Sequence, residues 1–242
     1  MSNVYLVRHG QAGTRDSYDS LSQLGKRQSR LLGEHFISQG IRFASAYSGA
    51  MSRQQETAQE VASAFADAGI SFPAISVDPG WDEFDLGQVH DEIAPQLCAE
   101  DPDFRREYEE MLKQVRISAG THADRVHRKW LPCDTKLVDA WIGGQRQYSG
   151  ETWQQFRERI ASCRLRIGDS QARENILVVT SATPIAIWAG LSLEIFDDRL
   201  MRLAGVLYNS SYTVMRLREA QLRLFSFNEV PHLPAPGLRT HR

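Results

Sequence analysis

Short apolar runs alternate along the chain with amphipathic segments, and this pattern predicts an α/β fold. Residues 4–7 (Val-Tyr-Leu-Val) and residues 176–179 (Ile-Leu-Val-Val) are apolar without a break, which is typical of strands buried on both faces. Segments between such runs carry apolar residues three and four positions apart, as an amphipathic helix does. Because strands that alternate with helices pair in parallel through helical crossovers, we expect a mostly parallel sheet.

The first part of the chain repeats this strand–helix order. Ser22 is typical of a helix N-cap, and the helix that it begins is expected to end near Gly40. A second helix, which Gly69 stops, shows apolar residues at i, i+3, i+4 and i+7. These residues are Ala58, Val61, Ala62 and Phe65. Short strands are predicted at residues 43–47 and 75–77.

Residues 90–148 break the alternation. This break predicts a helical insertion within a single domain of residues 1–242. We expect the insertion to form a cap at the mouth of the binding site. The insertion contains one clear apolar helical stripe, formed by Phe104, Tyr108, Met111, Leu112 and Val115. It also contains a basic stretch at residues 122–129, which is either a solvated face or a border of the site that contacts an acidic substrate. It carries no motif for a substrate.

The core pattern resumes after the insertion. A helix is expected to bury the stripe formed by Trp153, Phe156, Ile160, Cys163 and Ile167. After the strand at residues 176–179, Thr183 is a candidate N-cap, with Pro184 at the first helical position. Residues 212–217 and 222–227 predict a hairpin, and the tail after it, rich in Pro and Arg, is expected to be loose. The whole pattern predicts a three-layer α/β/α sandwich.

The composition argues against a few classes of function and favours none in particular. With 42% hydrophobic residues and a formal net charge of −2, the chain should have no bulk attraction to nucleic acid or to a membrane surface. The three cysteines, Cys98, Cys133 and Cys163, are widely spaced, which favours free thiols over a zinc site or a redox pair. No apolar run approaches the roughly 20 residues of a membrane span, and no signal-peptide pattern is present. We therefore expect a cytoplasmic protein.

Candidate chemistry gathers where the predicted strands end. In sheets of this kind, ligands bind beyond the carboxyl ends of the strands. Arg8 and His9 follow the first strand, Arg53 follows the strand at residues 43–47, and residues 180–183 open a helix after the late strand. Arginine forks and helix N-termini bind phosphate oxygens, and a neutral imidazole is a nucleophile toward phosphorus. This set of residue types therefore indicates phosphate chemistry.

Each of these signals has an ordinary structural reading as well. The Arg-His-Gly tripeptide of residues 8–10 could be a polar turn, and Arg53 could be a solvated helix residue. Glu83, in the run Trp-Asp-Glu-Phe-Asp, could be a loop carboxylate. Because all three signals occur in order along one α/β chain, we favour a common functional role over three separate structural explanations.

Five segments together resemble the histidine phosphatase superfamily, with its phosphoglycerate-mutase-like fold. Residues 6–12 (Leu-Val-Arg-His-Gly-Gln-Ala) look like its opening motif, and residues 48–58, which contain Arg53 and end in Thr-Ala, are similar to its second arginine segment. Glu83, followed by Asp85 and Gly87, matches the general-acid segment. Residues 150–152 and the ending at residues 227–233 resemble family segments as well.

The resemblance implies a role for each matched residue. His9 would attack the phosphoryl group and become a phosphohistidine, and Arg8 and Arg53 would clamp the phosphate oxygens. Glu83 would protonate the leaving group and then help water to attack. Gln11, in the opening motif, is a further candidate for phosphate binding. The expected ligand is a phosphorylated small molecule or a phosphate ion. No cofactor is implied, no Asp/His cluster has metal-ligand spacing, and the sequence leaves the oligomeric state open.

One segment departs from the family pattern. Family members usually carry a second His after the late strand, in a Ser-His-Gly-Gly type of motif, whereas here Ser181 stands at that position and Ala182 and Thr183 replace the glycines. Ser181 could still donate a neutral hydrogen bond to a phosphate, and loss of one preorganised donor typically costs ~10²–10³ in turnover. The leading expectation is a phosphomonoester hydrolase of reduced activity. A catalytically impaired relative that binds phospho-ligands or a partner is second, and a mutase-like phosphotransferase is third.

Overall fold

The structure is a computed structural model, and its described residues form two compact units. It describes residues 2–13, 19–117, 131–167, 174–218 and 221–241. Among these residues, the first unit comprises 2–13, 19–83 and those from 159 onward, and the second comprises those between 84 and 158.

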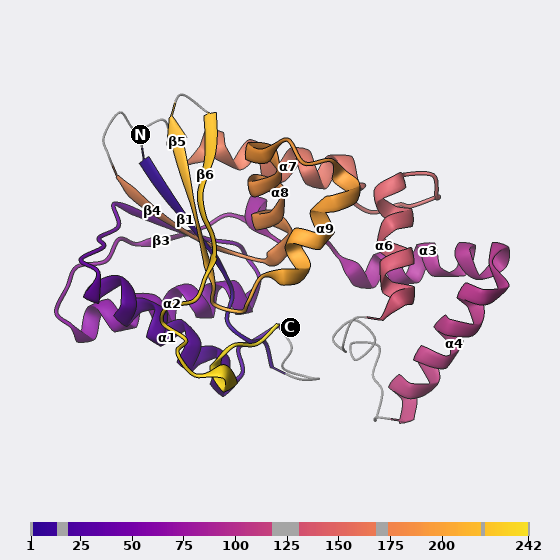
Figure 1. Cartoon of the computed structure of the whole chain (residues 1–242), viewed down its shortest axis with the longest axis horizontal. Coiled ribbons are helices and arrows are strands. Elements are labelled where there is room, and N and C mark those ends of the chain that lie inside the picture. The colour runs from indigo at the N-terminus through magenta and orange to yellow at the C-terminus, as the bar shows by residue number, and fades with distance from the viewer. Residues whose placement is uncertain (1, 14–18, 118–130, 168–173, 219–220, 242) are drawn as a thin grey trace. The chain divides into compact units, whose positions relative to one another are not determined.

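The first unit is built on a six-stranded sheet in the order β3-β2-β4-β1-β5-β6 (Figure 1). Its strands are β1 (Ser2–Arg8), β2 (Ser45–Ser48), β3 (Ile75–Val77), β4 (Asn175–Thr180), β5 (Tyr212–Arg218) and β6 (Gln221–Glu229). The first four in spatial order run parallel, and β5 and β6 add an antiparallel hairpin at one edge. The predicted mostly parallel sheet and the predicted hairpin are both confirmed.

Helices cover both faces of this sheet, which confirms the three-layer α/β/α architecture. On one side lie α1 (Gln23–Ser38) and α2 (Ser52–Asp67), and on the other lie α8 (Ala182–Leu193) and α9 (Asp197–Val206) (Figure 1). The apolar stripes of α1 and α2 bury Leu32, Phe36 and Phe65 against the alternate residues of β1 and β4 that face them. This packing fixes the strands whose carboxyl ends carry the candidate residues.

The predicted helix starts are right in one case and wrong in another. Ser22 is the N-cap of α1, and its side chain accepts a hydrogen bond from the N–H of Gly25. For α8, however, the N-cap is Ser181, so the prediction of Thr183 as N-cap with Pro184 at the first helical position is wrong. Pro184 is instead the third helical residue, where proline is tolerated because N–H groups of the first turn have no partner within the helix.

The second unit is helical. It contains α3 (Leu86–Glu100), α4 (Pro102–Ile117), α6 (Pro132–Gly143) and the first turns of α7 (Trp153–Arg166). His90 of α3 is buried, lies 3.3 Å from Asp134 of α6 and is 3.3 Å from the hydroxyl of Tyr108 of α4, so it ties the three helices together. The basic stretch at residues 122–129 lies outside the described residues. The cap at residues 90–148 stays a prediction in its boundaries and its role.

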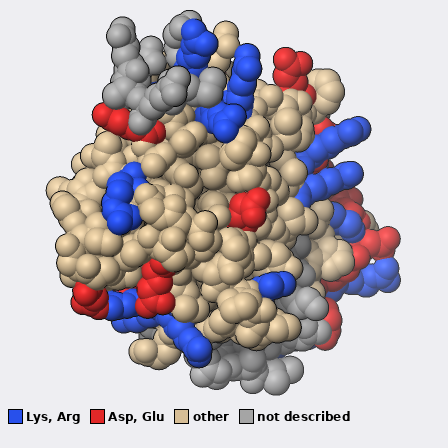
Figure 2. Space-filling model, turned by 60° about the vertical axis from the view of Figure 1, so that its left-hand side comes forward, with Lys and Arg blue, Asp and Glu red and all other residues tan. Residues whose placement is uncertain are grey.

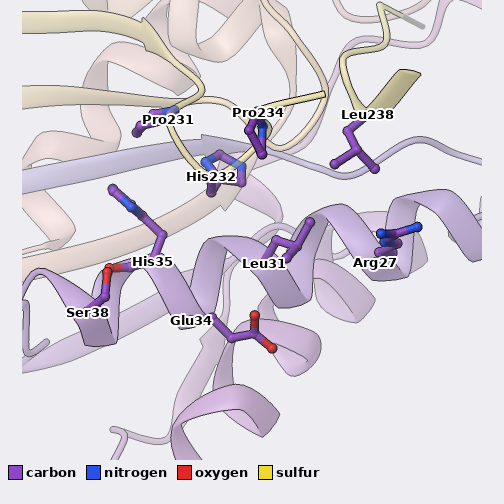
Figure 3. A pocket seen from close by; sticks show the side chains of 9 residues that line it. All are labelled: Arg27, Leu31, Glu34, His35, Ser38, Pro231, His232, Pro234 and Leu238. Carbon is purple, nitrogen blue, oxygen red and sulfur yellow. The ribbon is translucent and has the colours of Figure 1, made fainter. Parts of the chain in front are cut away.

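The C-terminal tail is held in place, so the expectation of a loose tail is wrong. Leu233 is fully buried, and the side chain of Gln28 on α1 donates to the carbonyl of Leu238 at 2.7 Å. Between the tail and α1 lies an open groove of about 430 Å³ (Figure 3). It is lined by Arg27, Leu31, Glu34, His35, Ser38, Pro231, His232, Pro234 and Leu238.

Charged side chains of both signs are interspersed on the face of the molecule in Figure 2, and uncharged residues cover most of that face. The formal net charge is −2. In the part of the chain that the structure describes, no helix is both long and apolar enough to cross a membrane.

Candidate active site

Three neighbouring strands end together and carry the candidate residues. β1 pairs with β4 so that Arg8 is opposite Thr180, and the N–H of His9 donates to the carbonyl of Thr180 at 2.9 Å. On the other side of β4, the N–H of Gly49, directly after β2, donates to the carbonyl of Val179. His9 and Ser181 are therefore the residues that follow two adjacent parallel strands.

His9 is held in one tautomer at this edge. Its side chain is buried, and Nδ1 lies 2.8 Å from the carbonyl oxygen of Gly10, which can only accept a hydrogen bond. Nδ1 therefore carries the proton, and the lone pair of Nε2 accepts from Nε–H of Arg53 at 3.2 Å. The nitrogen that carries the lone pair thus faces the guanidinium of Arg53.

Arg53 lies in the first turn of α2 and is 8% exposed. The hydroxyl of Thr57 donates to the carbonyl of Arg53 and accepts from the N–H of Gly10, which ties this turn to the loop after β1. The Nη1 atom of Arg53 lies 2.8 Å from a carboxylate oxygen of Asp19, and the other oxygen accepts from the N–H of Ser52. In this structure the Asp19 carboxylate therefore occupies donors that could serve a phosphate oxygen.

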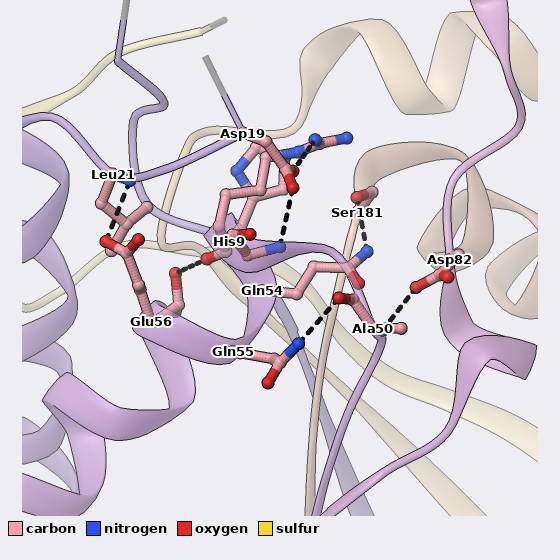
Figure 4. A network of polar contacts seen from close by, with 12 residues as sticks. His9, Asp19, Leu21, Ala50, Gln54, Gln55, Glu56, Asp82 and Ser181 are labelled. Atoms are coloured by element: carbon pink, nitrogen blue, oxygen red, sulfur yellow. Dashed lines mark hydrogen bonds and ion pairs between the residues drawn. The ribbon is translucent and has the colours of Figure 1, made fainter. Parts of the chain in front are cut away.

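Ser181, which we expect at the position of the family's second His, accepts a hydrogen bond from a glutamine of α2. Ser181 is 1% exposed, and its hydroxyl oxygen accepts from Nε2 of Gln54 at 2.9 Å (Figure 4). Although Ser181 is the N-cap of α8, its side chain makes no capping hydrogen bond. The strand end after β4 thus presents a neutral hydroxyl fixed by a neutral amide.

Glu83 and Asp82 anchor two backbone segments of the site. One carboxylate oxygen of Glu83 accepts from the N–H of Thr183 in the first turn of α8, at 3.1 Å. Asp82 accepts from the N–H of Ala50 at 2.6 Å and so holds the loop that leads into α2. Burial raises the pKa of the Asp82 carboxyl, against the opposing effect of its backbone hydrogen bonds and of two nearby arginines.

The other two predicted residues are engaged elsewhere. Arg8 is buried and donates through Nη1 to the carbonyl of Leu207, between α9 and β5. The amide oxygen of Gln11 accepts from the hydroxyl of Ser22, the N-cap of α1, at 2.8 Å. The phosphate-binding roles of these two residues stay predictions.

The structure thus joins most of the predicted residues through direct contacts. His9 meets Arg53, the next residue Gln54 meets Ser181, and Glu83 meets the helix that Ser181 begins. Asp19 and Gln54 also contact these residues, Asp82 contacts Ala50 in the loop that leads into α2, and none of the three was predicted from the sequence. Gln54 and Asp82 are neighbours of predicted residues, which is a usable signal, whereas nothing local marks Asp19. Among the described residues, no three His, Cys, Asp or Glu side chains are grouped as for a metal ion.

Solved structures with the same fold include a phosphatase and a phosphoglycerate mutase. A protein from Bacillus stearothermophilus, YhfR, is 18% identical with a TM-score of 0.64, covering 96% of this chain and 99% of its own. A phosphoserine phosphatase from Entamoeba histolytica, in complex with 3-phosphoglyceric acid, is 16% identical with a TM-score of 0.60, covering 96% and 100%. A phosphoglycerate mutase from Bacillus anthracis is 16% identical with a TM-score of 0.58, covering 96% and 94%.

Comparison at the level of sequence assigns the family. No curated protein sequence matches the chain. The model of the histidine phosphatase superfamily (branch 1), in contrast, matches residues 4–141 and 132–230, which is most of the chain. Because that match includes the Arg-His-Gly segment, the arginine segment of α2 and the strand before Ser181, the chain belongs to the histidine phosphatase superfamily, branch 1.

Proposed function

We propose that this protein hydrolyses phosphomonoesters through a phosphohistidine on His9. The observation that carries the proposal is the fixed tautomer of His9, whose Nε2 lone pair faces Arg53. A ring nitrogen with its lone pair beside an arginine fork is placed to attack a phosphorus atom whose oxygens that arginine binds.

The reaction runs in two steps. Nε2 of His9 attacks phosphorus, the P–O bond of the ester breaks, and protonated Glu83 donates its proton to the leaving oxygen. Water then attacks the phosphohistidine while the Glu83 carboxylate accepts a proton from it, and the P–N bond breaks to release phosphate and neutral His9. Arg8, Arg53 and Ser181 hold the phosphoryl oxygens in both steps, and Gln11 assists from the loop after β1.

The activity is expected to be lower than in relatives with His at the position of Ser181. A protonated imidazole makes a charge-assisted hydrogen bond, roughly twice as strong as the neutral one that a hydroxyl offers. We infer a phosphorylated small molecule as substrate, since two structures of the same fold are a phosphoserine phosphatase with 3-phosphoglyceric acid and a phosphoglycerate mutase. We also infer a cytoplasmic location.

A second candidate is a relative that binds a phosphorylated ligand without turning it over. Two observations favour it, the neutral Ser181 and the engagement of the Glu83 carboxylate by the N–H of Thr183. A mutase is third, because returning a phosphoryl group efficiently should require the full positive charge of the pocket.

An assay with a generic aryl phosphate and a set of phosphorylated metabolites separates these functions. Turnover by the wild type that is lost in His9→Ala supports the hydrolase. No turnover by either protein, with phosphate still bound by the wild type, supports the binding protein. Transfer between two metabolites faster than hydrolysis supports the mutase.

The proposed reaction needs no metal ion, because His9 supplies the nucleophile and arginines supply the charge. Turnover should therefore be unchanged after treatment with EDTA. Loss of turnover in EDTA that a divalent cation restores would contradict this part of the proposal.

A further inference from the structure

The amide of Gln54 contacts two other groups of the site, the hydroxyl of Ser181 and the carbonyl of Trp81. Gln54 is the third residue of α2, next to Arg53, and is fully buried. Its Nε2 atom donates to Ser181 Oγ at 2.9 Å and lies 3.4 Å from the carbonyl oxygen of Trp81. One amide group thus reaches both the loop before Glu83 and the start of α8.

The carbonyl of Trp81 determines which way the amide is turned. A carbonyl oxygen only accepts, and this one also accepts from the hydroxyl of Thr180. Turning the Gln54 amide over would place its oxygen against that carbonyl, so the NH₂ group must face it. Gln54 is therefore a donor to Ser181, and the Ser181 oxygen is an acceptor.

This assignment decides where the Ser181 proton points. With a lone pair of its oxygen taken by Gln54, the O–H group must be directed away from the amide. The helix does not use the Ser181 side chain as a capping acceptor. Ser181 follows β4 as His9 follows β1, on the adjacent parallel strand, so the hydroxyl is at the edge of the sheet where His9 lies.

The loop after β2 leaves room for the Gln54 side chain in this position. A Cβ atom on Gly49 would lie 1.9 Å from the amide oxygen of Gln54, so only glycine leaves room for that oxygen there. The packing of the loop after β2 thus supports one position of the Gln54 side chain.

We propose that Gln54 is a positioning residue that turns Ser181 into a hydrogen-bond donor toward the phosphoryl group. That the acceptor is an oxygen of a phosphoryl group rests on the proposed function. In this pair the amide fixes the hydroxyl, and the hydroxyl supplies the bond to a phosphoryl oxygen that an imidazole supplies in other family members.

A double-mutant cycle on two readouts tests the pair. The variants are Gln54→Met, Ser181→Ala and their combination, and the readouts are kcat on an aryl phosphate and the Kd of orthovanadate by calorimetry. Each single variant should lower kcat and weaken vanadate binding by about tenfold, the loss of one neutral donor, and the combination should lose no more than either alone. Losses that multiply in the combination, or a Gln54→Met variant equal to wild type, would overturn the proposal.

Gln55→Met is the matched control. Gln55 is the next residue on α2, and its Nε2 donates to the backbone carbonyl of Ala50 rather than to Ser181. Its kcat and vanadate affinity should stay within about twofold of wild type. If Gln54→Met fails to fold, Gln54→Glu keeps the shape of the side chain but accepts from the Ser181 hydroxyl. That variant should weaken vanadate binding by more than tenfold, and unchanged binding would overturn the proposal.

The two readouts separate this proposal from the proposed function. A wild type that binds vanadate but shows no turnover contradicts the hydrolase, and the cycle on vanadate affinity then still decides the role of Gln54. A wild type with neither turnover nor vanadate binding would overturn both.

Discussion

The two strand ends that meet at the candidate site differ in the chemistry that they present. After β1, the imidazole of His9 is fixed by the carbonyl of Gly10 and by the charged group of Arg53. After β4, the hydroxyl of Ser181 is fixed by the neutral amide of Gln54. The two strands run side by side in parallel, so the backbone offers both ends the same placement.

This difference bears on the proposed reaction. The end of β1 keeps the groups that a nucleophile needs, a fixed tautomer and a neighbouring cation. In the proposed reaction, Ser181 at the end of β4 supplies a neutral donor to the phosphoryl oxygens. We therefore expect attack on phosphorus to depend strongly on the β1 end, and the β4 end to adjust the rate.

His9→Asn is expected to have the largest effect on turnover. Asn has no ring nitrogen to attack phosphorus, so kcat on an aryl phosphate should fall by at least ~10³-fold, as when the nucleophile of an enzyme is removed. His241→Asn, an exposed residue near the C-terminus, is the control and should equal wild type. Turnover in His9→Asn within tenfold of wild type would show that the β1 end is not where the chemistry occurs.

Arg53→Lys should have the next largest effect. Lysine keeps the charge but loses the planar fork that reaches His9 through Nε and Asp19 through Nη1. We expect kcat/KM to fall by about 10²-fold. Arg30→Lys on α1, where the arginine pairs with exposed Asp67, is the control and should stay within twofold. Equal activities of the two variants would mean that the charge of Arg53 alone matters.

His232 contacts a segment that holds the end of β1, and its contribution to stability should depend on pH. The N–H of Ser210 donates to the carbonyls of Arg8 and His9, and the side chain of Ser210 contacts His232 at 3.4 Å. Burial, together with the nearby His35, lowers the pKa of His232 to about 3, whereas an unfolded histidine has a pKa of about 6.5. Below pH 6.5 the unfolded chain therefore binds a proton that the folded protein does not, so stability falls as the pH falls toward 3.

The expected size is about 2 kcal/mol lost at pH 5 relative to pH 7, about thirtyfold in the unfolding equilibrium. His232→Gln should remove most of this loss in urea unfolding at the two pH values. His241→Gln is the control and should retain the full loss. A pH dependence in His232→Gln equal to that of wild type would show that His232 is not the group responsible.

Sequence reasoning could find the fold because its signals are local. The unbroken apolar runs that became β1 and β4, and the capping serine of α1, each act within a few residues. The wrong N-cap of α8 shows the limit of a positional preference. Ser181 and Thr183 both suit an N-cap, and the backbone of Ser181 alone is extended before the helix.

The candidate site could be predicted only in part. His9 and Arg53 are marked by motifs, but the contacts that fix their state come from residues far along the chain. Gln54 and Ser181 are 127 positions apart, and Asp19 and Arg53 are 34 apart. No periodicity or spacing rule encodes such pairs, because they depend on how strands and helices pack in three dimensions.

Ser181→His with Thr183→Gly is the smallest expected change and sharpens the comparison most, because it rebuilds the β4 end to resemble the family pattern. A protonated imidazole would add a charge-assisted bond to oxygens that gain charge in the transition state. The turnover of an aryl phosphate should rise by about tenfold, equivalent to about 1.4 kcal/mol of transition-state binding.

Thr183 is changed as well because it is buried and would crowd the ring, whereas its N–H, which binds Glu83, is kept by glycine. Thr183→Gly alone is the control and should not gain. If the double variant folds, binds vanadate as wild type does and gains nothing, the β4 end does not face the reacting group, and the difference between the two strand ends has no bearing on the rate.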